Sequence, residues 1–157
     1  MELLWSRLEG QDGHTAAYKL LAQLAGDPLP EIVRSPQGKP FFPDRDLHFS
    51  ISHTSHHAFC CLSSKNIGID AEECDRKINT SMTRFLSPSE LARYKSASDK
   101  QACLLRLWVL KESYAKLTGR GLGNYLKNTD FDPDDPRIQI IDGCYVAVIE
   151  EGDRYAL

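Results

Sequence analysis

The sequence predicts an α+β fold in which antiparallel sheets pack against one long helix. Three observations lead to this prediction. Short stretches of alternating apolar and polar residues follow one another between residues 47 and 71, the longest helical pattern comes next at 103–117, and a hairpin pattern follows at 138–149. Because strands and helices are grouped rather than strictly alternating along the chain, the sheets are expected to be antiparallel.

Before these strands, the chain is expected to form one amphipathic helix and one small hairpin. Leucine and alanine recur at helical spacing over 17–24, and Gly26-Asp27-Pro28 stops this pattern. A turn-rich segment, 36–40, separates the apolar runs 32–33 and 41–42, as a hairpin or tight loop requires.

Three consecutive strands are predicted next. Leu47, Phe49 and Ile51 alternate with polar residues, which indicates a half-buried strand. Further strands are expected over 58–62 and 66–71, each after a short polar turn. Because consecutive strands joined by short turns tend to be neighbours, we expect these three to form an antiparallel meander.

Start and stop signals mark the helices that follow. Ser87-Pro88-Ser89-Glu90 fits a capping box with proline at the first helical position. Ser98 with Gln101 repeats this pattern, and the apolar residues of 103–117 then continue for about five turns. Gly119 is expected to close this long helix in a left-handed conformation.

The last elements are expected to be strands. Asp142-Gly143, which suits a tight hairpin turn, joins the apolar runs 138–141 and 144–149. A further turn at 151–153 is expected to lead into a last short strand.

The composition is that of an ordinary folded protein. The chain has 157 residues, 41% of them hydrophobic and 26% charged, and a formal net charge of −3. We expect one domain, 1–157, with an N-terminal half (1–63) and a C-terminal half (64–157).

The slightly acidic balance argues against nucleic-acid binding. The absence of a leader pattern and of an apolar run of roughly 20 residues argues against a membrane protein and for a cytoplasmic one. The five cysteines form no C-x-x-C pair and are expected to be free thiols.

Four side chains that are far apart in the sequence have the chemistry of a hard-cation site. Asp70 and Glu72 lie at the end of a predicted strand and point to the same side of it. Glu112 and Lys116 are four residues apart on the long helix and share a face. Mg²⁺ typically binds a few carboxylates together with substrate phosphates, so Asp70, Glu72 and Glu112 are candidate metal ligands. The alternative is a solvated strand edge beside a surface ion pair.

Five segments, in this order, resemble the signatures of the 4′-phosphopantetheinyl transferase superfamily. They are Gly38-Lys39-Pro40, Phe49-Ser50-Ile51-Ser52-His53-Thr54, Gly68-Ile69-Asp70-Ala71-Glu72, Arg84-Phe85-Leu86-Ser87-Pro88-Ser89-Glu90, and the segment 108–122. The W-x-x-K-E-S-x-x-K pattern within 108–122 is the most specific of them. The resemblance spans 38–122, which is over half of the chain.

The resemblance implies both a fold and an enzyme activity. Members of this family transfer the phosphopantetheine arm of coenzyme A to a serine of an acyl or peptidyl carrier protein and release adenosine 3′,5′-bisphosphate. This is holo-acyl-carrier-protein synthase activity, and the carrier would belong to fatty-acid, polyketide or nonribosomal peptide biosynthesis. The implied fold is a pseudo-two-fold arrangement of two small halves, with a magnesium ion that bridges the diphosphate of coenzyme A.

The resemblance also implies roles for particular residues around the metal. It assigns the ion to Asp70, Glu72 and Glu112, which agrees with the interpretation drawn from the residues themselves. Lys116 would add positive charge at the diphosphate, and either Glu112 or Lys116 would help to deprotonate the carrier serine. Glu90 resembles an acid that orients a metal-bound water or the incoming hydroxyl, and its capping box is an equally good explanation.

Three further residues are implied to hold coenzyme A. Lys39 and His53 resemble the residues that bind its phosphates and adenosine end, and Ser52 could add a hydroxyl. The longer, surfactin-synthetase-activating type of the family has more chain before the G-K-P motif than the 37 residues found here. The remaining candidates for the 3′-phosphate are His14, Lys19 and Arg34. We expect a shortened, pseudo-symmetric monomer.

Other functions are compatible with these residues. Three carboxylates and a lysine could serve a magnesium-dependent phosphohydrolase or nuclease, although the acidic character speaks against a nucleic-acid substrate. A carrier-protein-binding module without activity is a second alternative, but such a module would not need mutually repelling carboxylates. A zinc site is a third, and strand alternation would scatter its ligands over two faces: His53, His56, His57, Cys60 and Cys61.

Overall fold

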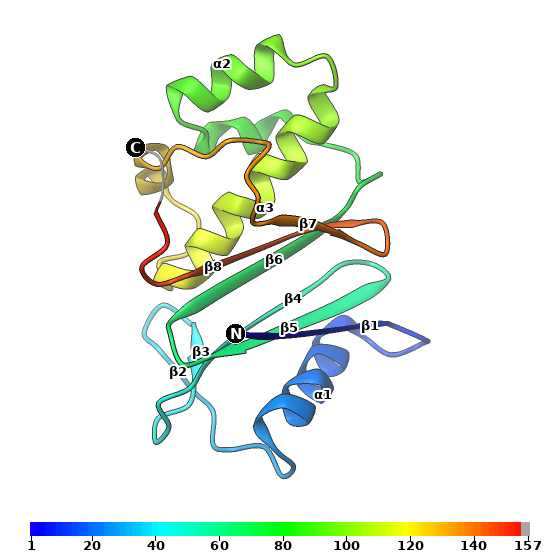
Figure 1. Cartoon of the computed structure of the whole chain (residues 1–157), viewed down its shortest axis with the longest axis vertical. Helices are drawn as coiled ribbons and strands as arrows, with labels where there is room; N and C mark the ends of the chain where they lie inside the picture. The colour runs from blue at the N-terminus through cyan, green and yellow to red at the C-terminus, as the bar shows by residue number, and fades with distance from the viewer. Residues whose placement is uncertain (155–157) are drawn as a thin grey trace.

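A computed structural model describes residues 1–154, which form four stacked layers (Figure 1). The helix α1 (Gly13–Ala25) covers the outer face of a first three-stranded sheet, and a second three-stranded sheet packs on its inner face. The long helix α3 (Lys100–Thr118) covers the second sheet. The functional residues predicted from the sequence come mainly from the second sheet and α3.

The sheets are assembled from distant parts of the chain. The first has the order β1 (Glu2–Arg7), β5 (His57–Ser63) and β4 (His48–His53), and the second has the order β6 (Ile67–Glu73), β8 (Cys144–Glu150) and β7 (Ile138–Ile141). The other elements are a hairpin of β2 (Val33–Arg34) and β3 (Pro40–Phe41), the 3-10 helices η1 (Thr80–Phe85) and η2 (Asn124–Asn128), and α2 (Pro88–Ser96).

The two halves of the chain share one topology. In each half, a first strand of the three-stranded sheet is followed by a helix and then by the other two strands of that sheet, and the last of the three lies between the other two. All pairs in both sheets are antiparallel. The predicted α+β class with antiparallel sheets is therefore confirmed. The pseudo-two-fold relation between the halves stays a prediction.

One strand, β5, contributes to two cores, because alternate side chains of a strand point to opposite faces. Phe59 and Cys61 point into the space between the sheets, where they join a cluster with Ile67 and Ile69 of β6. The side chains that point the other way pack with α1; they are Ala58, Cys60 and Leu62. This double burial explains the nearly continuous apolar character of the strand.

The predicted meander is wrong in its third strand. β4 and β5 pair as expected, with Phe49 opposite Leu62, but β6 pairs with β8, with Asp70 opposite Ala147. β6 is covered on one face by the first sheet and on the other by α3. It is therefore stacked on the first sheet rather than lying within it, and its partner must come from elsewhere in the chain.

Two serines of β4 join the sheets along the edge where β4 and β6 meet. The hydroxyl of Ser50 accepts a hydrogen bond from the N–H of Ile69 (3.1 Å), and the hydroxyl of Ser52 accepts one from the N–H of Ala71 (3.2 Å). These side chains satisfy backbone groups that would otherwise be unpaired at a sheet edge. The polar positions of the S-x-S-H segment thus have a structural role.

The predicted N-terminal cap is confirmed for α2, whereas the cap of α3 lies one residue later than predicted. Ser87 Oγ accepts from the N–H of Glu90 (3.1 Å), and the Glu90 carboxylate accepts from the N–H of Ser87 (2.7 Å). The prediction of Ser98 as the second cap is wrong, because Asp99 caps α3 and accepts from the N–H of Ala102 (3.0 Å). A carboxylate also interacts favourably with the positive end of the helix dipole.

The predicted turns are found where they were expected. Gly119 ends α3 with φ 70°, and Asp142 and Gly143 both have positive φ in the turn between β7 and β8. β2 and β3 form the expected small hairpin, with Val33 opposite Phe41. The strand β1 was not predicted, and the last predicted strand lies beyond the described residues.

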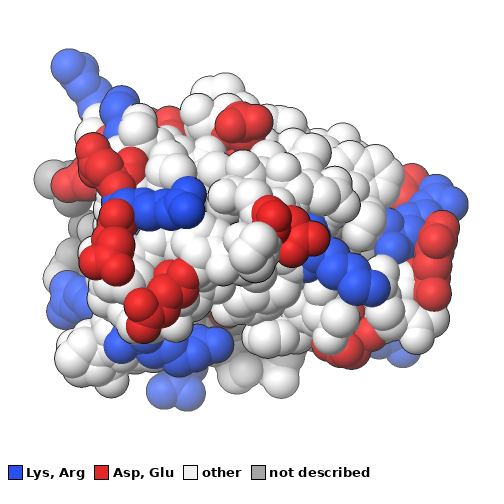
Figure 2. Space-filling view, turned by 90° about the horizontal axis from the view of Figure 1, so that it is seen from below, with Lys and Arg blue, Asp and Glu red and all other residues white. Residues whose placement is uncertain are grey.

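Several properties of the whole chain agree with its composition. The five cysteines are free thiols, as predicted. Within residues 1–154, no helix has the length and apolar character needed to cross a membrane. Lys and Arg are interspersed with Asp and Glu on the face shown in Figure 2, which presents no continuous basic surface.

Candidate functional site

The site is built where β6 lies against α3. Asp70 and Glu72 come from the end of β6, and Glu112 and Lys116 come from α3. Gly68, two residues before Asp70, allows this close approach, since a Cβ atom there would lie 2.0 Å from the carbonyl oxygen of Ser113. The glycine of the G-I-D-x-E segment is thus required by packing.

Asp70 is the most enclosed acid of the group, with 6% of its surface exposed. Its Oδ1 accepts from Lys116 Nζ (2.8 Å) and from the Ser52 hydroxyl (3.1 Å). Its Oδ2 is buried and has no hydrogen-bond partner among the described residues. A buried carboxylate oxygen without a partner is costly, so Oδ2 is the atom of this site that is best suited to contact a cation.

The other two acids show that the group is electrostatically coupled. Burial, followed by the negative charge of Asp70, raises the pKa of Glu72 to about 7. The same two causes raise the pKa of Glu112 to about 7, and Glu72 adds to that effect. Lys116 opposes both shifts. The structure therefore brings the three predicted carboxylates and the predicted lysine into one electrostatic cluster.

The cluster is not a ready-made metal cage. Within residues 1–154, no three Asp, Glu, His or Cys side chains are already arranged to hold an ion. Asp70 is paired with Lys116 instead, and Glu72 is paired with Arg76. A divalent ion would have to replace these contacts with its own.

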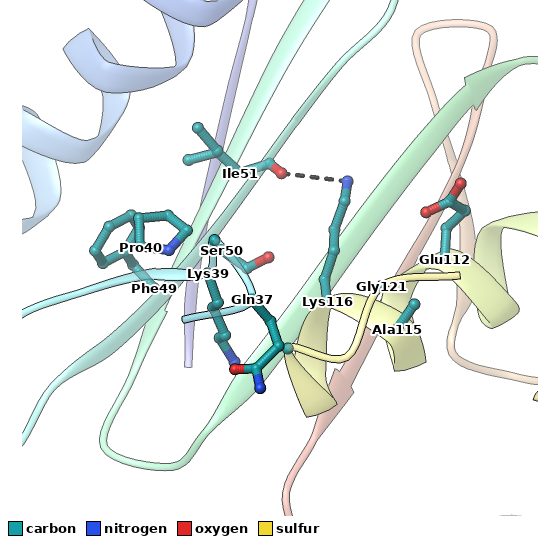
Figure 3. Close-up of a pocket in the computed structure, with 12 residues that line it drawn as sticks. Gln37, Lys39, Pro40, Phe49, Ser50, Ile51, Glu112, Ala115, Lys116 and Gly121 are labelled. Carbon is teal, nitrogen blue, oxygen red and sulfur yellow. Dashed lines mark hydrogen bonds between the residues drawn. The ribbon is translucent and has the colours of Figure 1, made fainter. Parts of the chain in front are cut away.

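A cleft of about 240 Å³ opens on the α3 side of the cluster. Glu112 and Lys116 line it from α3, and Lys39, Ser50 and Ile51 line it from the N-terminal half. Figure 3 shows the Lys116 side chain crossing from α3 toward β4, where Nζ donates to the Ile51 carbonyl (3.3 Å). The cleft therefore lies between the two halves of the chain.

Lys39 lines this cleft, but its ammonium group is engaged by protein atoms. Nζ donates to the Leu117 carbonyl near the end of α3 (2.8 Å) and to the Asn66 side chain. Burial lowers the pKa of Lys39 to about 8. In this state Lys39 caps the last turn of α3, and a phosphate contact would require its side chain to move.

His53 and Ser52 lie on the other side of the cluster. His53 is exposed and lines a second cleft of about 480 Å³ together with Thr54, Glu72 and Arg76. Its ring lies so close to Gly13, at the start of α1, that a Cβ atom there would be 2.5 Å from the imidazole. Ser52 is buried and contacts Asp70. The two predicted coenzyme A residues of β4 thus flank the acidic cluster.

Glu90 lies apart from the cluster, in a buried ion pair. Its carboxylate contacts Lys111 Nζ at 2.8 Å, and both side chains are fully buried. It also accepts from the N–H groups of Ser87 and Phe131 (both 2.7 Å). Lys111 in turn donates to the Thr129 carbonyl (2.8 Å). These contacts are those of a residue that joins α2, α3 and the segment after η2.

The zinc ligands considered from the sequence do not gather. Cys60 and Cys61 point to opposite faces of β5, as strand alternation predicts. His57 contacts Asp142 (2.8 Å), while His56 contacts Glu73 (2.7 Å). Both histidines therefore contact carboxylates of the C-terminal half rather than a common set of metal ligands.

Two residues of the site were missed at the sequence level. Trp108 is a core residue of the C-terminal half, and its indole also lies close enough to Glu72 to lower the pKa of that acid. Arg76 pairs with Glu72 from the turn after β6. No motif marks Arg76, because its role depends on how the chain turns beyond the strand.

Comparison with known proteins identifies the family. A model of the 4′-phosphopantetheinyl transferase superfamily matches residues 66–148, more than half of the chain. A 4′-phosphopantetheinyl transferase of Bacillus subtilis is 32% identical over 129 residues, which cover 76% of this chain and 58% of that protein. The 4′-phosphopantetheinyl transferase gsp of Aneurinibacillus migulanus is 33% identical over 117 residues, 70% of this chain and 48% of that protein. The chain spans about half the length of the curated relatives it matches. It therefore belongs to the 4′-phosphopantetheinyl transferase superfamily, as the sequence motifs predicted.

Proposed function

We propose that the protein transfers the 4′-phosphopantetheine arm of coenzyme A to a serine of an apo acyl or peptidyl carrier protein. The observation that carries this proposal is the cluster of Asp70, Glu72, Glu112 and Lys116, drawn together by β6 and α3 inside the family-matched segment. The names of the relatives support the same activity.

Magnesium fits the donor set of this cluster. Asp70, Glu72 and Glu112 would hold the ion through carboxylate oxygens, the ligands that Mg²⁺ prefers, and the unpartnered Asp70 Oδ2 supports this assignment. Bound there, the ion would neutralise charge that develops on the diphosphate.

In the proposed reaction, the serine oxygen forms a bond to the phosphorus that carries the pantetheine arm. The bond from this phosphorus to the bridging diphosphate oxygen breaks, and adenosine 3′,5′-bisphosphate leaves. Lys116 Nζ donates hydrogen bonds to Asp70 and Ile51, as an ammonium does, so it is better suited to hold negative charge than to accept a proton. We assign the general base to Glu112, which lines the cleft beside Lys116 and would take the proton of the carrier serine.

Mass measurement of a carrier protein tests the proposal. We expect an apo carrier incubated with the protein, coenzyme A and Mg²⁺ to gain the phosphopantetheinyl mass, and EDTA to abolish the gain. Hydrolysis of coenzyme A without carrier modification would favour the phosphohydrolase, and carrier binding without either reaction would favour the inactive module. The monomeric state and the cytoplasmic location stay predictions.

A further inference from the structure

Arg76 forms one wall of the cleft on the β6 side of the acidic cluster. It lies on the turn after β6, where its N–H donates to the Glu73 carbonyl (2.9 Å). The cleft is also lined by His53, Thr54 and Glu72. The Arg76 side chain is 42% exposed, and within residues 1–154 its guanidinium makes a single ion pair, to Glu72.

We propose that Arg76 binds a phosphate group of the nucleotide substrate and that Glu72 holds it in place until a divalent ion takes over this carboxylate. This inference rests on the proposed function, because it names a further substrate-binding residue of that site. It predicts opposite effects of Arg76 on the binding of two ligands. Arg76 competes with the metal ion for the Glu72 carboxylate, and it strengthens binding of the nucleotide.

The charge balance of the cluster supports this exchange. Three carboxylates face two cations, with Lys116 on the side of Asp70 and Arg76 on the side of Glu72. When all three carboxylates are ionised, this leaves one negative charge. A divalent ion would change the balance to one positive charge, so a cation that had neutralised a carboxylate would become available to an incoming anion.

The two cations differ in how firmly they are held. Lys116 is 32% exposed and donates to two acceptors, Asp70 and the Ile51 carbonyl, from the last turn of α3. Arg76 is more exposed and has one carboxylate partner. Once Glu72 is withdrawn, Arg76 retains a planar set of N–H donors that matches phosphate geometry. Across the same cleft, His53 offers a second donor.

The test measures binding rather than turnover. Coenzyme A binding in Mg²⁺ and Mn²⁺ binding without coenzyme A are measured by calorimetry for the wild type and for Arg76→Gln, Arg76→Lys and Lys77→Gln. Lys77 is the control, because it is the adjacent exposed cation and its substitution changes the net charge equally. Far-UV circular dichroism checks the fold of each variant.

We expect Arg76→Gln to weaken coenzyme A binding by about 10-fold or more and to strengthen Mn²⁺ binding by about 3-fold. Arg76→Lys should recover part of the coenzyme A affinity, and Lys77→Gln should change neither ligand. Unchanged coenzyme A binding by Arg76→Gln, or equal losses for Arg76→Gln and Lys77→Gln, would overturn the inference. Weaker binding of both ligands would also overturn it.

These measurements are separable from the proposed function, because neither uses a carrier protein. If Arg76→Gln binds coenzyme A normally while the wild type modifies a carrier, only the role of Arg76 is wrong. If Arg76→Gln shows the expected opposite effects and no carrier is modified, the role of Arg76 stands and the transferase proposal fails.

Discussion

Gly68 of β6 lies directly against the backbone of α3 at Ser113, with no room for even a methyl group between them: a Cβ atom on Gly68 would be 2.0 Å from the Ser113 carbonyl oxygen. This contact sets the distance between the strand that carries Asp70 and Glu72 and the helix that carries Glu112 and Lys116. The position of the acidic cluster therefore depends on a residue with no functional group.

Gly68→Ala should separate β6 from α3. We expect a loss of about 3 kcal/mol or more in the free energy of unfolding, measured by urea denaturation, because the obstructing atoms belong to backbone and cannot rotate away. The transfer rate should fall in the fraction that stays folded, because the acids would be displaced from Lys116.

Gly123→Ala is the matched control for this substitution. Gly123 has extended backbone, and within residues 1–154 a Cβ atom there would meet only the Tyr125 side chain, at 3.3 Å. A ring can shift by a few tenths of an ångström, so we expect a change below about 1 kcal/mol. Equal stability of the two alanine variants would show that the packing argument at Gly68 is wrong.

Glu90→Gln should destabilise the protein strongly, because it leaves the charge of buried Lys111 without its carboxylate partner. We expect a loss of about 3–5 kcal/mol in the free energy of unfolding. The double variant Glu90→Gln with Lys111→Met should lose less than Glu90→Gln alone, since the unpaired charge is then absent.

This cycle also separates the two roles considered for Glu90. Wild-type stability of Glu90→Gln together with a large loss of transfer would favour the acid that orients a water or hydroxyl. Loss of stability with recovery in the double variant would favour the buried pair that the contacts indicate.

Local interactions were the most predictable part of the fold. The Ser87–Glu90 capping box, the left-handed Gly119 and the Asp142-Gly143 turn each depend on residues within a few positions of one another. Their geometry follows from the backbone preferences of the residue types at these positions. The acidic cluster was also predictable as a set, because its motifs are distinctive.

Long-range partners could not be predicted in the same way. The pairing of β6 with β8 joins residues about 75 positions apart, such as Asp70 and Ala147, and β6 would have alternated equally well beside β5. Lys39 was expected to face a phosphate, and only its distance to the end of α3 reveals the contact with Leu117. Tertiary packing determines such strand pairings and side-chain contacts.

Asp70→Asn should remove the stabilising effect of magnesium. The wild type is expected to show a Tm that rises with Mg²⁺ concentration, because an ion that binds only the folded state stabilises it. Asp70→Asn keeps the shape of the side chain but removes its charge, so its Tm should be independent of Mg²⁺ and its transfer rate should fall by about 100-fold or more. Asp46→Asn, an exposed acid in a loop, is the control and should respond to Mg²⁺ like the wild type. A normal magnesium response of Asp70→Asn would remove Asp70 from the ligand set.

The metal-free protein should become less stable as the pH rises from about 5 to 7.5. The pKa values of Glu72 and Glu112 are raised to about 7, from an ordinary value of 4.5, by burial and by Asp70. Between these values the folded state binds more protons than the unfolded state, so unfolding becomes easier as protons are removed. We expect a loss of roughly 2 kcal/mol over this interval, measured by urea denaturation in EDTA.

Glu112→Gln tests the origin of this pH dependence. Glutamine at position 112 cannot ionise. Removal of the Glu112 charge should also let the raised pKa of Glu72 fall, so the decline in stability with pH should become clearly shallower. Glu31→Gln, an exposed acid of the N-terminal half, should keep the wild-type slope. Saturating Mg²⁺ should reverse the trend in the wild type, since an ion held by carboxylates favours their charged form and binds more tightly as the pH rises. A wild-type slope in Glu112→Gln would mean that another group carries the effect and that the acids do not repel one another as their arrangement requires.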